Sequence, residues 1–290
     1  MLWIPFALLA ALMQACRNAF QKQLSKDVSI AGVTMARFLW ASPLVLGYLG
    51  LLYYWQPAAI PVFNANFFMF ISGAALTQII ATVFMVTLFK LRNYAIGAGL
   101  AKSEAVIAAL LGVAFFNESL SVLGWAGVML GAIAIFLLSG ASLRQFSWPV
   151  MLLGLGSGLS FSLGSLWVRQ ASLQMGLPFL HGAAWVLAAV ILLQSAIMFS
   201  YLLLREPATL GVLWQRPKLT LLVSFSSFFG SLGWFTAFSL ESVALVKTLG
   251  QVEVLFMLLI SSLFFKEKLR ISDHSGLVLI LIAAVAVIWA

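Results

Sequence analysis

The sequence predicts an all-α membrane protein of about ten transmembrane helices, built as two inverted five-helix repeats. Three observations lead to this fold class: a very apolar composition, a series of apolar runs, and an internal repeat. Of the 290 residues, 63% are hydrophobic and 8% are charged, whereas a soluble domain carries roughly 25% charged residues. A soluble surface would still need polar cover, so a chain of mean hydropathy +1.09 has lipid as its main solvent.

Apolar runs of about 20 residues recur along the whole chain between short polar breaks, which is the pattern of membrane-spanning helices. The runs are apolar on all sides, whereas the strands of a membrane barrel would alternate. Because the connections are short, sequence neighbours are expected to pack antiparallel. Pro43 lies inside the second run and should kink or weaken that helix, because proline lacks a backbone donor. The predicted spans cover residues 2–21, 29–54, 66–89, 94–116, 121–139, 148–169, 177–204, 218–239, 242–265 and 272–290.

An internal repeat divides the chain into two halves. A shift of 149 residues lays AKSEAVIAALLGVAFFNESL on GQVEVLFMLLISSLFFKEKL, within a gap-free match of segments 87–141 and 236–290. Apolar matches are common in membrane segments, but aligned glutamates and glycines are not. We therefore predict two five-helix domains, near residues 1–145 and 146–290. The shift aligns Glu104 with Glu253, Glu118 with Glu267, and Gly127 with Gly276.

The distribution of basic residues predicts that the second half is inverted relative to the first, as an odd number of spans per half requires. Eleven lysines and arginines lie in the loops after the odd-numbered spans, whereas the other face, termini included, holds only Arg169. The positive-inside rule then predicts a multi-pass protein of the bacterial inner (plasma) membrane with both termini periplasmic. The eleven are Lys22, Lys26, Lys90, Arg92, Arg144, Arg205, Arg216, Lys218, Lys266, Lys268 and Arg270.

The supply of metal-binding and thiol side chains is small. A single cysteine, Cys16, excludes a disulfide framework or a thiolate cluster. The only histidines, His181 and His274, lie far apart in the sequence, so we expect no metal, haem or other cofactor. The basic residues are explained by membrane topology, so no nucleic-acid partner is expected.

Each half carries a glutamate pattern across its fourth span, SEAVIAALLGVAFFNESL and VEVLFMLLISSLFFKEKL, followed by an apolar fifth span with a glycine near its start. Together with ARFLWASPLVL at 36–46, this resembles the EamA-type permeases of the drug/metabolite transporter superfamily. The resemblance implies a small-molecule permease, and the family handles amino acids, metabolites, drugs and sugar-linked cargo. The family often has proline after the first glutamate. Ala105 and Val254 stand there in this sequence, which predicts straighter helices.

Ionisable residues inside spans are costly, so each is a candidate for function. Glu104 and Glu253 lie near the middle of their spans and are repeat-equivalent. They are interpreted either as a pair that carries protons or binds substrate, or as neutral or hydrogen-bonded residues that pack the halves together. The helical spacings of Lys102 and Glu104, and of Lys247 and Glu253, predict that neither lysine pairs within its own helix. The full set comprises Arg17, Arg37, Lys102, Glu104, His181, Lys247 and Glu253.

Longer basic side chains can also reach the membrane interface. For Lys247 this reading competes with a place in a cavity, whereas for Arg17 and Arg37 we expect the interface. A polar stripe on the first span, formed by Gln14, Asn18 and Gln21, should face protein or a water-filled cavity. Two further residues, Gln78 and Trp234, are candidates for the same site. Gln78 and Trp234 could line the same cavity, although a packed tryptophan is the simpler interpretation. In the sixth span, Gly154, Gly158 and Ser162 predict a close helix crossing rather than a phosphate cradle, and Gly127 and Gly131 do so in the fifth.

These features favour a small-molecule permease that works by alternating access, an exporter for which proton coupling is left open. Four basic residues against two glutamates within the spans suggest a cargo with a carboxylate or phosphate, such as an amino acid. The alternative is a membrane-embedded enzyme acting on lipid-linked substrates, but no nucleophile–base pair or clustered carboxylates accompany it. A passive channel would need a ring of like residues or a filter loop. The expected partners are a small-molecule substrate, the lipid bilayer and, if coupled, protons.

Overall fold

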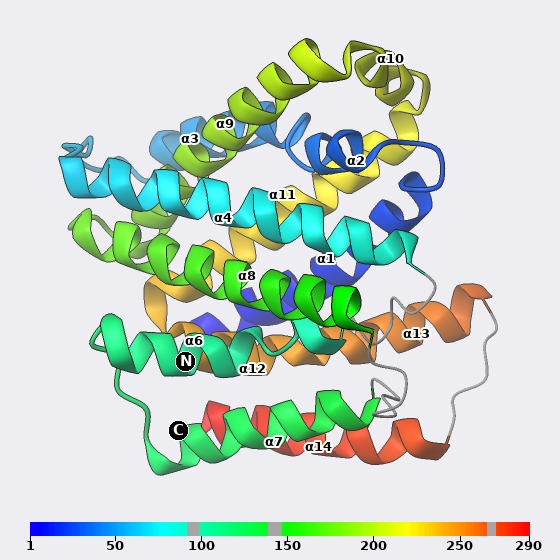
Figure 1. The fold of residues 1–290 in the computed structure, drawn as a ribbon. Helices are drawn as coiled ribbons and strands as arrows, with labels where there is room; N and C mark the ends of the chain where they lie inside the picture. The colour runs from blue at the N-terminus through cyan, green and yellow to red at the C-terminus, as the bar shows by residue number, and fades with distance from the viewer. Residues whose placement is uncertain (92–98, 139–146, 266–270) are drawn as a thin grey trace.

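The computed structural model describes residues 1–91, 99–138, 147–265 and 271–290, and the side chains of 260–265 and 271–274 are left out of the description. The described chain is helical, without strands (Figure 1). The helices are α1 (Trp3–Leu24), α2 (Ile30–Ala36), α3 (Ala41–Trp55), α4 (Ala65–Lys90), α6 (Glu104–Phe115), α7 (Val122–Leu138), α8 (Trp148–Gln174), α9 (Phe179–Arg205), α10 (Pro207–Gln215), α11 (Pro217–Leu240), α12 (Val243–Leu249), the 3₁₀ turn η2 (Gly250–Val252), α13 (Glu253–Phe265) and α14 (Ile271–Ile288).

Among the residues that the structure describes, five helical segments are long and apolar enough to cross a membrane: Ile30–Trp55, Ala65–Lys90, Trp148–Gln174, Phe179–Arg205 and Pro217–Leu240. Two shorter apolar helices, Val122–Leu138 and Ser275–Ile288, accompany them. The sequence of α1 is long enough but carries the polar stripe, which lowers its hydropathy. Each of these seven helical segments overlaps one of the predicted spans. The full count of ten spans stays a prediction.

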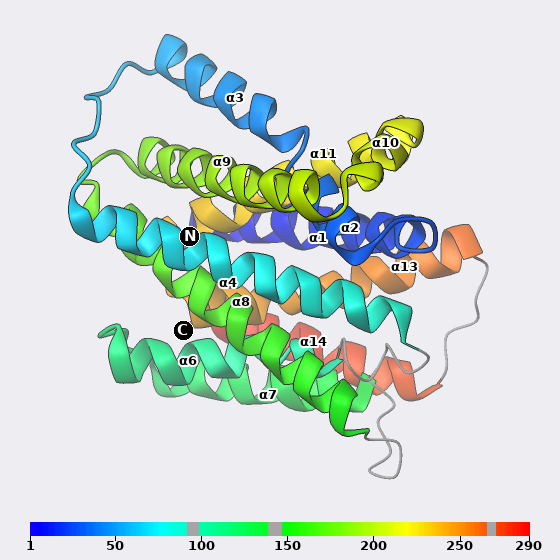
Figure 2. The ribbon, with the colours of Figure 1, turned by 45° about the horizontal axis from the view of Figure 1, so that its top comes forward.

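The strongest helix packing joins the first half of the chain to the second. Helix α1 packs along α11, α4 along α8, α3 along α9, and α7 along α14. The shift of 149 residues carries α1 onto α8 and α4 onto α11, so the first two pairs are repeat-equivalent. The two halves are therefore interlocked rather than placed side by side, and α7 and α14 form a layer below the other helices (Figures 1 and 2).

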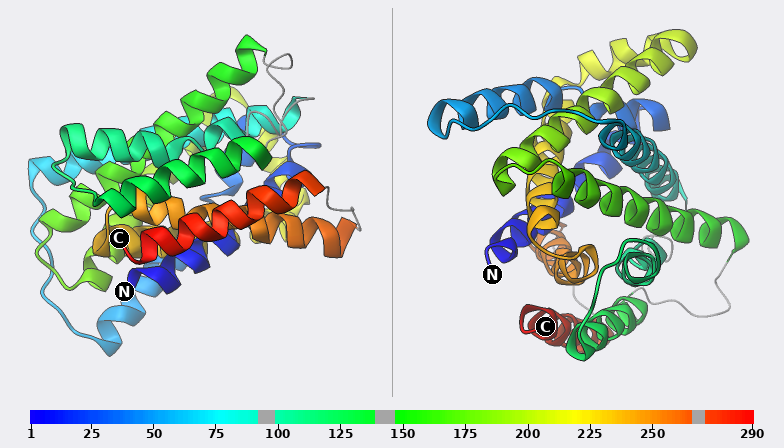
Figure 3. Two further views of the ribbon diagram at one scale, coloured as in Figure 1. Left: turned by 90° about the horizontal axis from the view of Figure 1, so that it is seen from below. Right: turned by 90° about the vertical axis from the view of Figure 1, so that its left-hand side faces the viewer.

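Both termini lie at one end of the bundle, which we call the terminal end (Figure 3). The turns that join α3 to α4, α8 to α9 and α11 to α12 lie at this end, whereas α10 lies at the opposite end (Figure 1). A crevice at the terminal end is lined by residues of both chain ends and by Glu241. The side of a membrane that this end faces remains a prediction.

The second span is broken where Pro43 predicts a kink. Residues 37–40 form turns between α2 and α3. These turns contain Leu39, whose carbonyl the ring of Pro43 would meet in a continuous helix. Side chains of neighbouring helices satisfy backbone groups at this break. Ser224 Oγ donates to Ala36 O at 2.5 Å and accepts from Trp40 N at 3.1 Å. Such a break is compatible with a membrane interior only because protein surrounds it.

The fourth span of each half also departs from a straight α-helix. Lys102 N and Ser103 N donate to carbonyls three residues earlier, at 3.0 Å each, so the chain tightens just before Glu104. In the second half, the 3₁₀ turn Gly250–Val252 stands at the repeat-equivalent place, just before Glu253. The expectation of straighter helices is therefore wrong, because the irregularity precedes the glutamate and needs no proline. Both glutamates begin a helix, where the helix dipole favours a negative charge.

Small residues form the predicted close crossings. A Cβ atom on Gly158 would lie 2.8 Å from Ser103 Oγ and 3.0 Å from Ala101 O, so α8 lies directly against the turn before Glu104. A Cβ on Gly127 would lie 2.6 Å from Val287 of α14, and a Cβ on Gly276 would lie 2.4 Å from Leu138 of α7. Close backbone approach of this kind drives helix association in lipid, where burial of apolar surface gives little.

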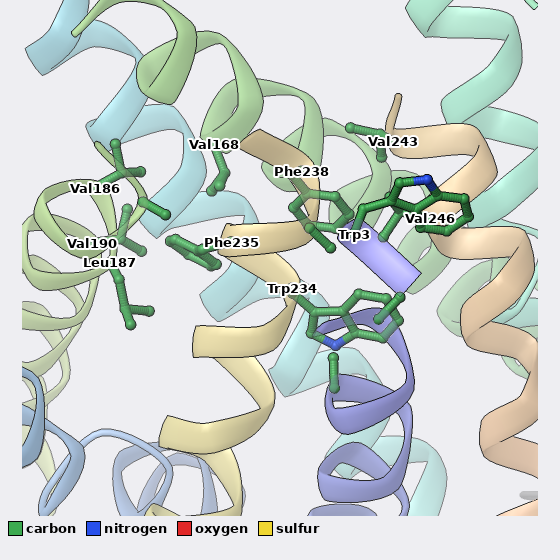
Figure 4. Packing of buried hydrophobic residues seen from close by; sticks show 14 of the residues in the cluster. Trp3, Val168, Val186, Leu187, Val190, Trp234, Phe235, Phe238, Val243 and Val246 are labelled. Carbon is green, nitrogen blue, oxygen red and sulfur yellow. The ribbon is translucent and has the colours of Figure 1, made fainter. Parts of the chain in front are cut away.

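Large apolar side chains pack around α11. Phe235 points toward Val186, Leu187 and Val190 of α9, while Trp234 lies beside α1 (Figure 4). The rings of Trp234 and Phe238 stack with their centroids 5.8 Å apart. This aromatic pair fixes one wall of the site described next.

Candidate functional site

Glu253 is the centre of a buried polar cluster. Its side chain is fully buried and forms an ion pair with Lys102. Its two carboxylate oxygens also accept hydrogen bonds from Gln14 Nε2 at 2.6 Å and from Asn18 Nδ2 at 2.7 Å. The donors come from α1 and from the turn before α6, and the acceptor begins α13, so the first half surrounds a carboxylate of the second.

Glu104 forms the reciprocal pair. Lys247 Nζ lies 3.1 Å from Glu104 Oε2, and both side chains are buried. The ammonium group also lies 4.5 Å from the ring centroid of Trp234, a cation–π geometry. Ser162 Oγ of α8 donates to the Glu104 backbone carbonyl at 2.7 Å. Here the second half supplies the cation and the first half supplies the carboxylate.

The pairing confirms that neither lysine bonds to the glutamate of its own helix. Lys102 and Lys247 each neutralise a carboxylate across the interface between the halves. For Lys247, the structure thus favours the interior position over the membrane interface. A buried ion pair of this kind is poor support for stability, because desolvation offsets much of the attraction. Its position between two halves makes it sensitive to their relative movement.

The polar stripe of α1 faces protein, as predicted. Gln14 donates to Glu253 and accepts from Trp234 Nε1 at 2.9 Å, so it connects the ion pair to α11. Gln21 is buried one turn beyond Asn18. Trp234 is packed in the core and donates to Gln14, and it is not among the residues that line the cavity described next, so the simpler interpretation of a packed tryptophan is favoured.

A small cavity lies beside the cluster. Its volume is about 20 Å³, enough for about one water. The walls come from five segments of the first half and from α8. The lining residues are Gln14, Arg17, Asn18, Gln21, Arg37, Thr82, Met85, Ala101, Lys102, Glu104 and Phe161.

The expectation that Arg17 and Arg37 reach the membrane interface is wrong. Both side chains are buried, with residue exposures of 4% and 5%, and both line the cavity. Distance from a helix end suggested the interface, but packing turns these side chains inward. Arg37 Nη1 donates to Thr82 Oγ1 at 2.5 Å, one turn after Gln78 on α4.

Gln78 does not line the cavity. It is buried and accepts a hydrogen bond from Gln194 Nε2 at 3.2 Å. Gln194 was not singled out in the sequence, although a lone glutamine inside the apolar seventh span would have marked it. His181 is buried near the terminal end, where its Nε2 lies 2.7 Å from Gln56 O. The His274 side chain lies outside the described residues.

A second polar cluster, also not predicted, lies at the terminal end. Arg169 Nε lies 3.0 Å from Glu118 Oε1, and Arg169 Nη1 donates to Phe238 O and Glu241 O. Burial is the main cause that raises the pKa of Glu118 above its usual value, against the attraction of Arg169. Two sequence signals could have located this cluster: Arg169 is the lone basic residue of its face, and Glu118 belongs to the repeat pattern.

The side chains of the site do not resemble those of a metal centre. In the part of the chain that the structure describes, no three His, Cys, Asp or Glu side chains come together in a way that could hold a metal ion. The chemistry available at the cavity is proton exchange on carboxylates and binding of charged or hydrogen-bonding groups.

Comparisons with known proteins agree with the resemblance described above. The EamA-like transporter family matches residues 1–140 and 148–289. The uncharacterized transporter YvbV of Bacillus subtilis (strain 168) is 26% identical over 170 residues, which cover 57% of this chain; the match spans about half of that relative, 53% of its length. A solved crystal structure superimposes with a TM-score of 0.73 at 15% identity, over 98% of this chain and 95% of the other, which shows a shared fold.

Proposed function

Because this chain belongs to the EamA-like transporter family, we propose that it is an alternating-access permease that exports a small molecule and uses Glu104 and Glu253 for binding or coupling. Family members are transporters rather than enzymes, so the chain is a multi-pass membrane permease with a small-molecule substrate. The lipid-linked enzyme alternative has no nucleophile–base pair to support it. The working units of the proposal are the two halves, near 1–145 and 146–290.

One observation carries this proposal: both glutamates are ion-paired to a lysine of the opposite half, next to a tightened helical turn. Movement of one half against the other would separate these pairs. Loss of one partner from a buried pair costs roughly 3–5 kcal/mol. A proton on the carboxylate, or a substrate charge on the lysine, would offset that cost and so couple binding to movement.

The two glutamates differ in how well they are satisfied. Glu253 accepts from two amides as well as from Lys102, whereas in the described part of the chain Lys247 is the one side chain that donates to the Glu104 carboxylate. A carboxylate with fewer donors has fewer hydrogen bonds to break when its lysine moves away. Within this proposal, Glu104 is therefore the carboxylate that exchanges protons, and Glu253 organises the site.

The test is substrate flux in proteoliposomes, with and without a pH gradient, across amino acids, organic anions and lipophilic cations. We expect gradient-driven flux in the wild type, loss of gradient dependence in Glu104→Gln, and loss of transport in Glu253→Gln. The matched control is Glu206→Gln, which changes a carboxylate at the opposite end of the bundle, where it accepts from Ser29. This variant should behave as wild type.

Unchanged flux in both glutamine variants would reduce the two glutamates to structural residues. Flux that is equal in all four proteins and independent of the gradient would contradict proton coupling while leaving a permease. No flux of any compound by the wild type would count against the proposal as a whole.

A further inference from the structure

The basic residues of the membrane interior fall into two classes. Lys102 and Lys247 each have a glutamate partner, whereas Arg17 and Arg37 have no carboxylate partner among the described residues. The six described carboxylates are all engaged elsewhere. Asp27 pairs with Arg216, Glu104 with Lys247, Glu118 with Arg169 and Glu253 with Lys102, while Glu206 accepts from Ser29 and Glu241 from the backbone of Ser242.

The two guanidinium groups are also poorly satisfied by neutral partners. Arg37 donates to Thr82, and Arg17 donates to Asn18 at 3.4 Å, but the Nε atoms of both arginines are buried without a hydrogen-bond partner within the described structure. Their charges repel each other, although Glu104 and Glu253 attract Arg17 from a distance. Two buried cations with spare donors therefore face one cavity without a carboxylate partner among the described residues, which is costly for each charge.

The arginines belong to one half only. The shift of 149 residues places Leu166 at the position of Arg17 and Val186 at the position of Arg37, and both apolar residues are fully buried. The same fold thus accommodates aliphatic side chains at these positions in the second half. The fold therefore does not need a charged side chain at these two positions. A role other than packing has to account for the two arginines.

We propose that Arg17 and Arg37 bind the anionic group of the transported molecule, a carboxylate or a phosphate, in the cavity that they share with Thr82 and Glu104. This inference rests on the proposed function. Guanidinium groups suit the purpose, because their forked donors match the oxygens of carboxylates and phosphates. The cavity now has room for about one water, so the rest of the molecule enters when the helices separate. Arg37 stands at the break between α2 and α3, where such movement is easiest.

The test measures binding to the purified protein in detergent, by thermal-shift titration. The probes are succinate, L-leucine and glycerol 3-phosphate, each beside the counterpart that lacks the anionic group: succinamide, L-leucinamide and glycerol. We expect at least one anion to bind and its counterpart to be at least tenfold weaker, as charge-assisted hydrogen bonds predict. The carboxylate and phosphate arms identify which oxyanion is preferred.

Variants assign the binding to the arginines. Arg37→Gln and Arg17→Gln should weaken anion binding about ten- to hundredfold, whereas Arg37→Lys should retain part of it. Thr82→Val keeps the charge of Arg37 but removes its anchor, so it provides a milder change if a glutamine variant does not fold. Arg216→Gln removes an exposed arginine paired with Asp27 and should bind as wild type does.

Equal binding of anions and their counterparts, no binding of any anion, or an equal effect of Arg37→Gln and Arg216→Gln would overturn the inference. Flux separates this failure from failure of the proposed function. If proteoliposomes transport compounds without an anionic group and Arg37→Gln changes nothing, the permease stands and the anion site falls. If anions bind through Arg37 but no compound crosses the membrane, the anion site stands and the permease falls.

Discussion

At the residue scale, the ion pair of Arg169 and Glu118 connects three separate segments at the terminal end. Glu118 belongs to the turn between α6 and α7, Arg169 to α8, and the carbonyls of Phe238 and Glu241 to the end of α11. The Glu118 side chain is 6% exposed. Any widening of this end must therefore separate a buried charge from its partner, which opposes opening there.

The raised pKa of Glu118 predicts how stability depends on pH. Burial holds the proton on the folded carboxyl group to a higher pH than in the unfolded chain. The folded state then binds more protons, so the contribution of Glu118 to stability is greatest below its unfolded pKa. That contribution declines as pH rises through the folded pKa. We expect the thermal midpoint of the wild type to fall relative to that of Glu118→Gln as the pH rises above 4.5, the ordinary pKa value for this carboxyl group.

The measurement is a set of melting curves in detergent at half-unit pH steps. Ser119→Ala, a change at an exposed position of the same turn, should follow the wild type at every pH. Parallel curves for wild type and Glu118→Gln, or a difference of opposite sign, would contradict the prediction.

Predictions for single residues were correct where they depended on the internal repeat of the sequence or on the helical period. The equivalence of Glu104 and Glu253, the inward polar face around Gln14, and the exclusion of intrahelical lysine pairs are of this kind. The partners themselves were beyond sequence reasoning, because Lys102 and Glu253 are 151 residues apart. Arg37 was misplaced because its distance from a helix end says nothing about the direction of its side chain.

At the element scale, the 3₁₀ turn Gly250–Val252 and the tightened turn at Lys102–Ser103 are the irregular features that the two repeats share. A stretch of 3₁₀ hydrogen bonds inside a longer helix often marks a hinge. Here each stretch precedes a glutamate whose partner is in the other half. Hydrophobic periodicity located these spans but could not reveal the turns, because a change from four-residue to three-residue hydrogen bonding leaves the apolar pattern nearly intact.

Gly250 tests the importance of this turn. A Cβ atom there would overlap Trp234 Cη2, so Gly250→Ala should displace the indole and break its bond to Gln14. We expect a loss of roughly 1–3 kcal/mol, the usual cost of overpacking, read as a lower thermal midpoint together with weaker transport. Gly47→Ala, in α3 with no atom within 4 Å of the new Cβ, is the matched control and should be neutral or slightly stabilising. Equal midpoints for the two variants would argue against the packed turn.

At the scale of the whole molecule, the packing partners of the helices follow the repeat. The pairs α1–α11 and α4–α8 are exchanged by the shift of 149 residues, and α7 packs on its own equivalent, α14. The all-helical class and the family were predicted from composition and the glutamate pattern. The interlocked arrangement was not, because a linear repeat is equally compatible with two separate bundles. The domain boundaries and the count of ten spans remain predictions.

The orientation in the membrane is tested at this scale. Because the sequence places eleven basic residues in the loops that follow the odd-numbered predicted spans, we expect both termini on the periplasmic side. A reporter enzyme that is active only in the periplasm should be active when fused after Ala290, and a fluorescent protein that matures only in the cytoplasm should be dark there. The same reporters inserted in segment 205–217, which contains α10, should give the reverse result. Matching results at both positions would contradict the orientation.

The crosswise ion pairs also constrain how the chain is made. Lys102 and Glu104 leave the ribosome 151 and 143 residues ahead of Glu253 and Lys247. At about 5–20 residues per second, this delay lasts roughly 7 to 30 seconds. During that time the newly inserted first half holds a lysine and a glutamate in lipid without their final partners. Biogenesis of this protein therefore passes through a stage in which an incomplete chain carries charges without their partners inside the membrane. A chain truncated after the first half would keep these unpaired charges, and we expect membrane proteases to degrade it.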